Sequence, residues 1–211
     1  MRAVSLVVRL VYRPRMATAE RARRRLAEPK KQSGPPAGLR KRHDVRSRQV
    51  GGFPCHSVTP RGRTADRAAV YLHGGAYVSE ISPQHWTLVS RLADAGVRVE
   101  VPSYGLAPEH TYREAYPFVT AVYRELLTEV EASTVTILGD SAGGGLALGL
   151  AQTLAGSGLP QPRGATVWQR KPATSRLRTS CRFPSAAGGS ELPLAAAIRA
   201  RARSTVAIRG L

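Results

Sequence analysis

The chain has 211 residues and carries 32 basic against 14 acidic side chains, a formal net charge of +18. This length suits one ordinary domain, and a hydrophobic content of 42% allows a packed core. No apolar run approaches the ~20 residues of a membrane-spanning helix. Two cysteines, Cys55 and Cys181, exclude both a disulfide framework and a zinc cluster.

The charge is unevenly distributed along the chain. Residues 1–63 contain 17 basic and 3 acidic side chains, residues 64–166 contain 6 and 10, and residues 167–211 contain 9 and 1. Basic ends of this kind are attracted to nucleic acids and to anionic membrane surfaces. Neither end has zinc-ligand spacing or an aromatic-rich strand, so the pattern predicts no specific nucleic-acid recognition. Nonspecific binding to an anionic membrane or to nucleic acid stays open as an alternative function.

The N-terminal segment, residues 1–42, is predicted to be a basic helical cap followed by a linker. Apolar residues flanked by arginines within Met1–Leu10 predict an amphipathic helix that continues through Ala19–Ala27 and ends before Pro29. The apolar run is short and lacks a clear cleavage site, which argues against a secretory signal. The helix either packs on the domain or acts as a lid or membrane-surface helix. Pro29–Arg42 is predicted to be an exposed connection.

Residues 43–167 alternate short apolar runs with longer stretches of helical periodicity. Strands are predicted at Val45–Val50, Phe53–Thr59, Ala68–Leu72, Val97–Val101 and Thr134–Leu138, with a further strand beginning at Gly164. Helices are predicted at Pro83–Ala95, Arg113–Glu131 and Gly143–Ala155. This alternation is typical of βαβ units, so we predict an α/β fold with a mostly parallel sheet flanked by helices.

The remaining segment, residues 168–211, has a different composition. It is rich in Arg, Ala, Ser, Pro and Gly, and it contains one acidic residue, Glu191, and no histidine. Only Leu192–Arg203 has the pattern of a helix. We therefore predict a basic tail of low order.

The strongest chemical motif is Gly139-Asp140-Ser141-Ala142-Gly143, a G-x-S-x-G sequence between a predicted strand and a predicted helix. A sharp turn there would expose the Ser141 hydroxyl above the sheet, and small residues such as Gly139 and Gly143 would leave room for it. The alternative is an ordinary helix start with serine as its N-cap. The strand before and the helix after favour a nucleophile.

A second glycine motif, His73-Gly74-Gly75-Ala76, follows the strand Ala68–Leu72. Glycines let the backbone approach a substrate closely and direct amide groups toward it. The alternative is a simple Gly-Gly turn beside a packed histidine. Its place two βα units before Ser141 favours a role in the same site.

Together with Tyr104–His110, these motifs resemble the hormone-sensitive-lipase-like group of α/β-hydrolases, over about residues 1 to 166. The resemblance implies that Ser141 is the acyl-accepting nucleophile and that the amides of Gly74, Gly75 and Ala142 form the oxyanion hole. His73, Ala76, Gly139, Asp140 and Gly143 would support the loop and the turn. Gly105 stands where that group usually has arginine.

One departure concerns the catalytic base. In this fold the acid and the histidine follow the serine along the chain, whereas all five histidines here (His43, His56, His73, His85 and His110) precede Ser141, and Glu191 is the only later acid. We hypothesise that the chain is a truncated or frame-shifted family member whose genuine reading ends near Ala165–Val167. Substitution by an upstream histidine, His85 or His110, is a weaker hypothesis.

The predicted function is therefore that of a serine carboxylic-ester hydrolase acting through an acyl-enzyme, inactive or weak in this chain. Its substrate would be a small ester or lipid, with no metal or organic cofactor, in the cytoplasm or peripherally on a membrane. The alternatives are a non-catalytic remnant of such an enzyme and the anionic-surface binding protein described above. The sequence does not predict an oligomeric state.

Overall fold

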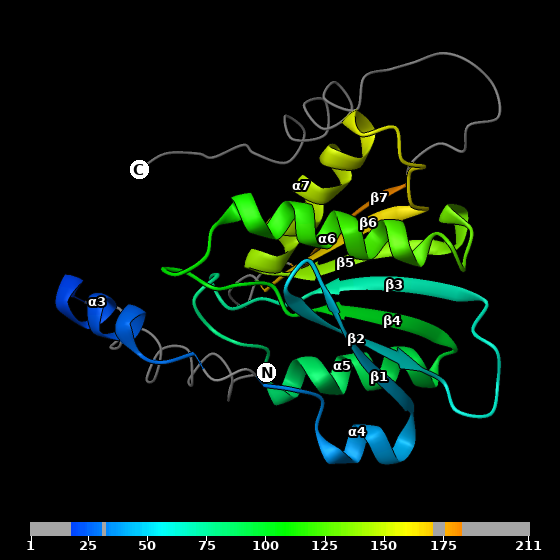
Figure 1. The fold of residues 1–211 in the computed structure, drawn as a ribbon, viewed down its shortest axis with the longest axis horizontal. Helices are drawn as coiled ribbons and strands as arrows, with labels where there is room; N and C mark the ends of the chain where they lie inside the picture. Colours follow the sequence, from blue (N-terminus) through cyan, green and yellow to red (C-terminus); the bar gives the residue numbers. More distant parts are fainter. Residues whose placement is uncertain (1–17, 31–32, 171–175, 183–211) are drawn as a thin grey trace.

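The computed structural model describes residues 18–30, 33–170 and 176–182. Seven strands form one sheet in the order β1-β2-β4-β3-β5-β6-β7 (Figure 1). The strands are β1 (Asp44–Val50), β2 (Phe53–Thr59), β3 (Arg67–Leu72), β4 (Val97–Pro102), β5 (Val135–Asp140), β6 (Gly164–Arg170) and β7 (Arg176–Arg182). The helices are α3 (Ala19–Ala27), α4 (Ala37–Arg42), α5 (Pro83–Asp94), α6 (Tyr112–Leu126), the short 3₁₀ helix η2 (Ala132–Thr134) and α7 (Ala142–Gly156).

The centre of the sheet is parallel and its edges are antiparallel. Strands β4, β3, β5 and β6 run parallel to their neighbours in this group, while β1, β2 and β7 pair antiparallel. The predicted α/β class and the flanked, mostly parallel sheet are confirmed. Each parallel strand ends at the same edge of the sheet, which places the ends of β3 and β5 side by side.

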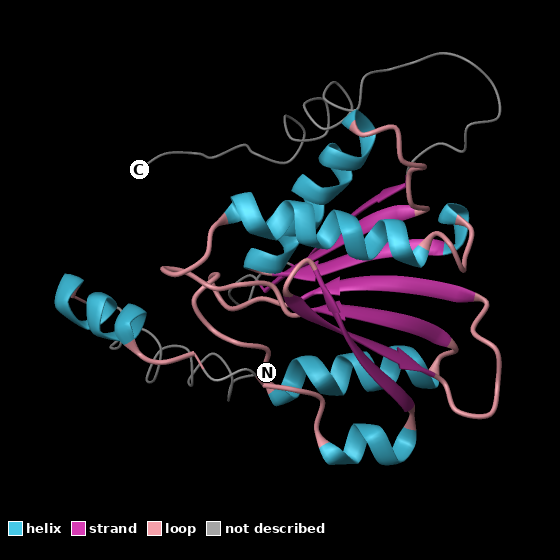
Figure 2. Cartoon of the chain, in the orientation of Figure 1, coloured by secondary structure: helices cyan, strands magenta, loops and turns pink. Residues whose placement is uncertain are grey.

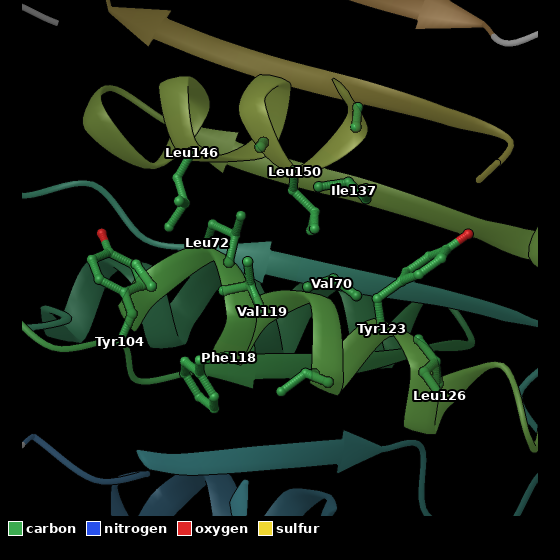
Figure 3. Packing of buried hydrophobic residues seen from close by; sticks show 14 of the residues in the cluster. Val70, Leu72, Tyr104, Phe118, Val119, Tyr123, Leu126, Ile137, Leu146 and Leu150 are labelled. Atoms are coloured by element: carbon green, nitrogen blue, oxygen red, sulfur yellow. The ribbon is translucent and has the colours of Figure 1, made fainter. Parts of the chain in front are cut away.

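Helices cover both faces of the sheet, with α6 and α7 on one face and α4 and α5 on the other (Figure 2). Alternate strand residues face opposite sides, so Val70 and Leu72 of β3 join the α6–α7 side while Tyr71 joins the α5 side. Figure 3 shows Val119 of α6 and Leu150 of α7 directed toward these strands. The buried side chains on these two faces form two hydrophobic clusters, which hold the ends of the strands in place.

Several boundaries differ from the sequence prediction. Helix α3 does not continue an upstream helix, because Thr18 has extended backbone and its side chain caps the helix by accepting from the Arg21 amide at 3.2 Å. The segment predicted as an exposed connection contains α4, which buries Leu39 against the sheet. Helix α6 ends at Leu126 rather than at Glu131.

The segment predicted to have low order contains additional strand structure. Strand β6 runs on to Arg170, and β7 pairs with it antiparallel from Arg176↔Arg170 to Arg182↔Gly164. The alternation of basic and less polar residues in Arg176–Arg182 is a strand pattern that the composition obscured. The predicted helices at Met1–Leu10 and Leu192–Arg203, and Glu191, lie outside the described residues.

Some of the excess positive charge has a structural role at helix ends. Arg61 donates to the Lys41 carbonyl at 2.8 Å, at the end of α4. Arg63 donates to the Asp94 carbonyl, and Arg67 to the Ala95 carbonyl at 3.2 Å, both at the end of α5. The last carbonyls of a helix lack partners within the helix and carry partial negative charge, so cations stabilise them. The positions of these arginines are therefore explained within the fold, without a nucleic acid or an anionic membrane.

Candidate active site

Ser141 occupies a strained turn between β5 and α7. Its backbone has φ +50° and ψ −118°, a left-handed conformation that L-residues rarely adopt, and the residue is exposed. A Cβ at Gly139 would overlap the main chain of Gly143, so the turn closes only because Gly139 lacks a side chain. The strand-turn-helix context predicted for the G-x-S-x-G motif is present.

The elbow, defined as Gly139–Gly143, lies directly against the end of β3. A Cβ at Gly143 would overlap the carbonyl oxygens of Leu72 and His73. The glycine loop, defined as His73–Ala76, begins at that point. The fold therefore brings the two predicted motifs into contact although they are more than 60 residues apart in the sequence.

His73 is held inside the protein as a neutral side chain. It is 1% exposed, its ring stacks on Tyr104 at 4.6 Å, and its Nδ1–H donates to the Gly74 carbonyl at 2.9 Å. Burial lowers the pKa of His73 to about 4. Its Nε2 has no hydrogen-bond partner among the described residues. These contacts fix the His73 ring beside the start of the glycine loop.

The glycine loop continues in left-handed backbone. The φ angles of Gly75, Ala76 and Tyr77 are +138°, +55° and +59°. The Tyr77 hydroxyl donates to the Ala142 carbonyl at 2.6 Å, which ties the loop to the first turn of α7. Alanine at position 76 thus adopts a conformation that glycine adopts with less strain.

Asp140, the residue before Ser141, connects the elbow to the glycine loop. Its Oδ1 accepts hydrogen bonds from the Tyr71 hydroxyl at 2.7 Å and from the Gly74 amide at 2.9 Å. The His85 Nε2 lies 3.5 Å from its Oδ2. Burial raises the pKa of Asp140, but the hydrogen bonds from His85, Tyr71 and Gly74 outweigh burial, so the pKa lies below its ordinary value.

One of the three amides predicted to form the oxyanion hole is already hydrogen-bonded within the protein. Because the Gly74 amide donates to Asp140, it is already engaged. The amides of Gly75 and Ala76 have no acceptor within residues 18–30, 33–170 and 176–182. Ala142 is the first residue of α7, where helix amides lack partners and the dipole is positive.

No described side chain is hydrogen-bonded to the Ser141 hydroxyl, and the five histidines have other contacts. His85, which the sequence offered as a substitute base, accepts from the Ser82 amide at 3.0 Å through Nδ1 and faces Asp140 through Nε2. His110, the other substitute, lies 3.6 Å from Glu114 and packs edge-on against Phe53. The His110 side chain also occupies the space that a Cβ at Gly105 would fill.

A pocket of about 300 Å³ is lined by residues that include Glu80, Leu106, His110 and Tyr104, the residue on which His73 stacks. Its lining does not include Ser141 or the loop glycines. Burial raises the pKa of Glu80. In the part of the chain that the structure describes, no group of three His, Cys, Asp or Glu side chains could hold a metal ion, and no helix is long and apolar enough to cross a membrane.

A family model for the α/β-hydrolase fold matches residues 69–186, more than half of the chain. The chain belongs to the α/β-hydrolase fold family. The match covers the glycine loop, the elbow and both β6 and β7.

Curated α/β-hydrolases are similar to this chain. An acetyl-hydrolase of Streptomyces hygroscopicus is 39% identical over 118 residues, which is 55% of this chain and 39% of that protein. An ethyl acetate hydrolase of Pseudomonas putida is 36% identical over 135 residues, 57% of this chain and 39% of that protein. The chain thus spans about two fifths of the length of these relatives.

Solved α/β-hydrolase structures superpose on the same region. The crystal structure of an esterase from the bacterial hormone-sensitive lipase family matches with a TM-score of 0.56 and 30% identity, covering 69% of this chain and 53% of that chain. A homologue of that family from a metagenome library, EstE7, matches with a TM-score of 0.56 and 29% identity, covering 72% and 51%. The resemblance to the hormone-sensitive-lipase-like group is confirmed.

The sequence did not predict three contacts of the elbow. Tyr71 and His85 contact Asp140, and Tyr77 contacts Ala142. Tyr71 appeared only as one apolar residue of a buried strand. Its hydroxyl reaches Asp140 because β3 and β5 are adjacent, a relation that no local pattern in the sequence reveals.

Proposed function

We propose that this protein is a serine carboxylic-ester hydrolase that forms an acyl-enzyme at Ser141. The observation that supports this most strongly is the exposed serine held at φ +50° on a turn that packs against the glycine loop. A nucleophile raised above the sheet on such a turn, with amides directed toward the same space, is suited to attack an ester carbonyl. The names of the relatives, acetyl-hydrolase and ethyl acetate hydrolase, favour a small ester as substrate.

In the reaction the Ser141 oxygen attacks the carbonyl carbon, and the carbonyl oxygen becomes an oxyanion. The sequence motif pointed to the amides of Gly74, Gly75 and Ala142 as its binding site. Since Gly74 donates to Asp140, we assign the loop's contribution to Gly75 and to the following amide, Ala76, together with Ala142. The alkoxide leaves as an alcohol, carrying the proton that Ser141 lost; water then attacks the acyl-enzyme, returns a proton to Ser141 and releases the acid.

The rate is expected to be low. A serine hydroxyl needs an adjacent base to remove its proton, and the histidines of this chain contact other groups. Oxyanion stabilisation and binding alone leave roughly 10³–10⁴-fold acceleration over water in intact serine hydrolases. Hydrolysis of p-nitrophenyl acetate by the purified chain, compared with Ser141→Ala, tests the proposal. A slow rate lost in the variant supports it, while equal rates reject catalysis by Ser141.

The second candidate is a non-catalytic member of the family. It is favoured by one observation, the absence of a hydrogen-bonded base at the Ser141 hydroxyl among the described residues. A fluorophosphonate probe separates the two candidates, because the rate at which it labels a serine reports how reactive that hydroxyl is. Labelling at Ser141 favours the hydrolase, and a complete lack of labelling favours the non-catalytic protein.

A further inference from the structure

We propose that Asp140 is a positioning residue that locks the glycine loop against the elbow and thereby sets the direction of the Gly75 and Ala76 amides. This inference rests on the proposed function, in which those amides bind the oxyanion. Asp140 is the last residue of β5 and is adjacent to Ser141. A shift of the Asp140 side chain would therefore move the main chain next to Ser141.

Asp140 and Gly74 are in close contact. The Gly74 amide donates to Oδ1 at 2.9 Å, and a Cβ at Gly74 would overlap the Asp140 carboxylate. The carboxylate therefore occupies the space that a side chain at position 74 would fill. A hydrogen bond to a charged acceptor is stronger than one to a neutral acceptor, so this contact restrains the start of the loop.

The carboxylate is itself held from two further sides. The Tyr71 hydroxyl, on a side chain that is 1% exposed, donates to Oδ1 at 2.7 Å. His85 accepts the Ser82 amide through Nδ1, which leaves the proton on Nε2, directed to Oδ2 at 3.5 Å. Two hydrogen bonds, from β3 and the glycine loop, and a 3.5 Å contact from His85 of α5 thus hold one side chain of β5. The other titratable groups facing the carboxylate are His73 and Tyr104, both buried.

The consequence concerns the residues after Gly74. Gly75, Ala76 and Tyr77 follow in left-handed backbone, where a small rotation at Gly74 changes the direction of each following amide. The Tyr77 hydroxyl fixes the far end of this segment to Ala142 at 2.6 Å. The loop is therefore pinned at both ends to the elbow, by Asp140 at its start and by Tyr77 at its end.

A nuclear magnetic resonance experiment on the ¹⁵N-labelled full chain tests this lock without requiring activity. In the wild type the Gly74 amide signal is expected to shift as Asp140 is protonated, at a pH below the ordinary aspartate pKa of 3.8. Asp140→Asn keeps the size of the side chain and should abolish that titration. Asp140→Ala should increase hydrogen exchange at the Gly74 amide by about tenfold or more.

Asp94→Asn is the matched control, because Asp94 lies near a histidine, His43, as Asp140 lies near His85, but it is at the far end of α5. It should leave the Gly74 signal and its titration unchanged. A Gly74 amide that titrates equally in wild type and Asp140→Asn, or that exchanges equally in Asp140→Ala, would overturn the lock.

The catalytic consequence is measured separately, as the rate of fluorophosphonate labelling at Ser141. Asp140→Asn should slow labelling about 10- to 100-fold while Asp94→Asn does not. If wild type and Asp140→Asn label at the same measurable rate, Asp140 does not position the reacting groups. If wild type is not labelled at all, the proposed function fails, and the amide titration still decides whether Asp140 locks the loop.

Discussion

Replacing Gly143 by alanine adds one methyl group at the point where the elbow meets β3. That methyl would overlap the carbonyl oxygens of Leu72 and His73. These atoms belong to the main chain and cannot rotate away as a side chain could, so the elbow or the glycine loop must move. Overpacking of a well-packed site typically costs about 1–3 kcal/mol. Because the neighbours are backbone, we expect Gly143→Ala to lower the free energy of unfolding by about 2–3 kcal/mol.

Gly156→Ala is the control in the same helix. Gly156 is the last residue of α7, and nothing lies within 4 Å of the position of its Cβ. Alanine has higher helix propensity than glycine, so this variant should be unchanged or more stable by up to about 1 kcal/mol. Urea unfolding followed by tryptophan fluorescence measures both. If the two variants are equally stable within about 0.5 kcal/mol, the close approach of elbow and loop is wrong.

Three further predictions concern buried or strained groups. Glu100→Gln should destabilise the fold by about 3 kcal/mol in urea unfolding, because the fully buried carboxylate lies between two arginine side chains; the exposed Glu131→Gln should change stability by less than about 0.5 kcal/mol. Ser141→Gly should raise the melting midpoint by relieving about 1–2 kcal/mol of backbone strain, whereas a rise of the same size in Ser141→Ala would show that strain is not the cause. His73 takes up its proton at a pKa of about 4 when folded and 6.5 when unfolded, so stability should fall by about 3 kcal/mol as pH drops from 6.5 to 4; a stability–pH curve for His73→Phe that keeps the full slope would contradict this.

The sequence predicted the central part of the fold because its signals are local. Apolar runs marked β3, β4 and β5, and the glycines around Ser141 marked a turn whose geometry depends on residues close in the chain. Strand β7 was missed because the composition of its surroundings, rich in arginine and proline, outweighed a seven-residue alternation. Helix α4 was missed because only one buried residue, Leu39, holds it to the sheet.

The contacts that organise the site could not be read from the sequence in the same way. Asp140 meets Gly74 across 66 positions and Tyr71 across 69, so their hydrogen bonds exist only once β3 and β5 are adjacent. The motif therefore placed Gly74 in the oxyanion hole, although its amide is used to hold the loop. The motif alone could not show that the Gly74 amide is already hydrogen-bonded to Asp140, a residue far away in the sequence.

The most direct test of the central claim is to identify the residue that receives an acyl group. The purified chain is incubated with p-nitrophenyl acetate, quenched in acid and digested, and the acetylated peptide is located by mass spectrometry. Because release of the acyl group by water also needs a base, the acyl-enzyme should accumulate. We predict one acetyl group on Ser141 that is absent from Ser141→Ala. Acetylation confined to other residues, or none after prolonged incubation, would contradict the assignment of Ser141 as the nucleophile.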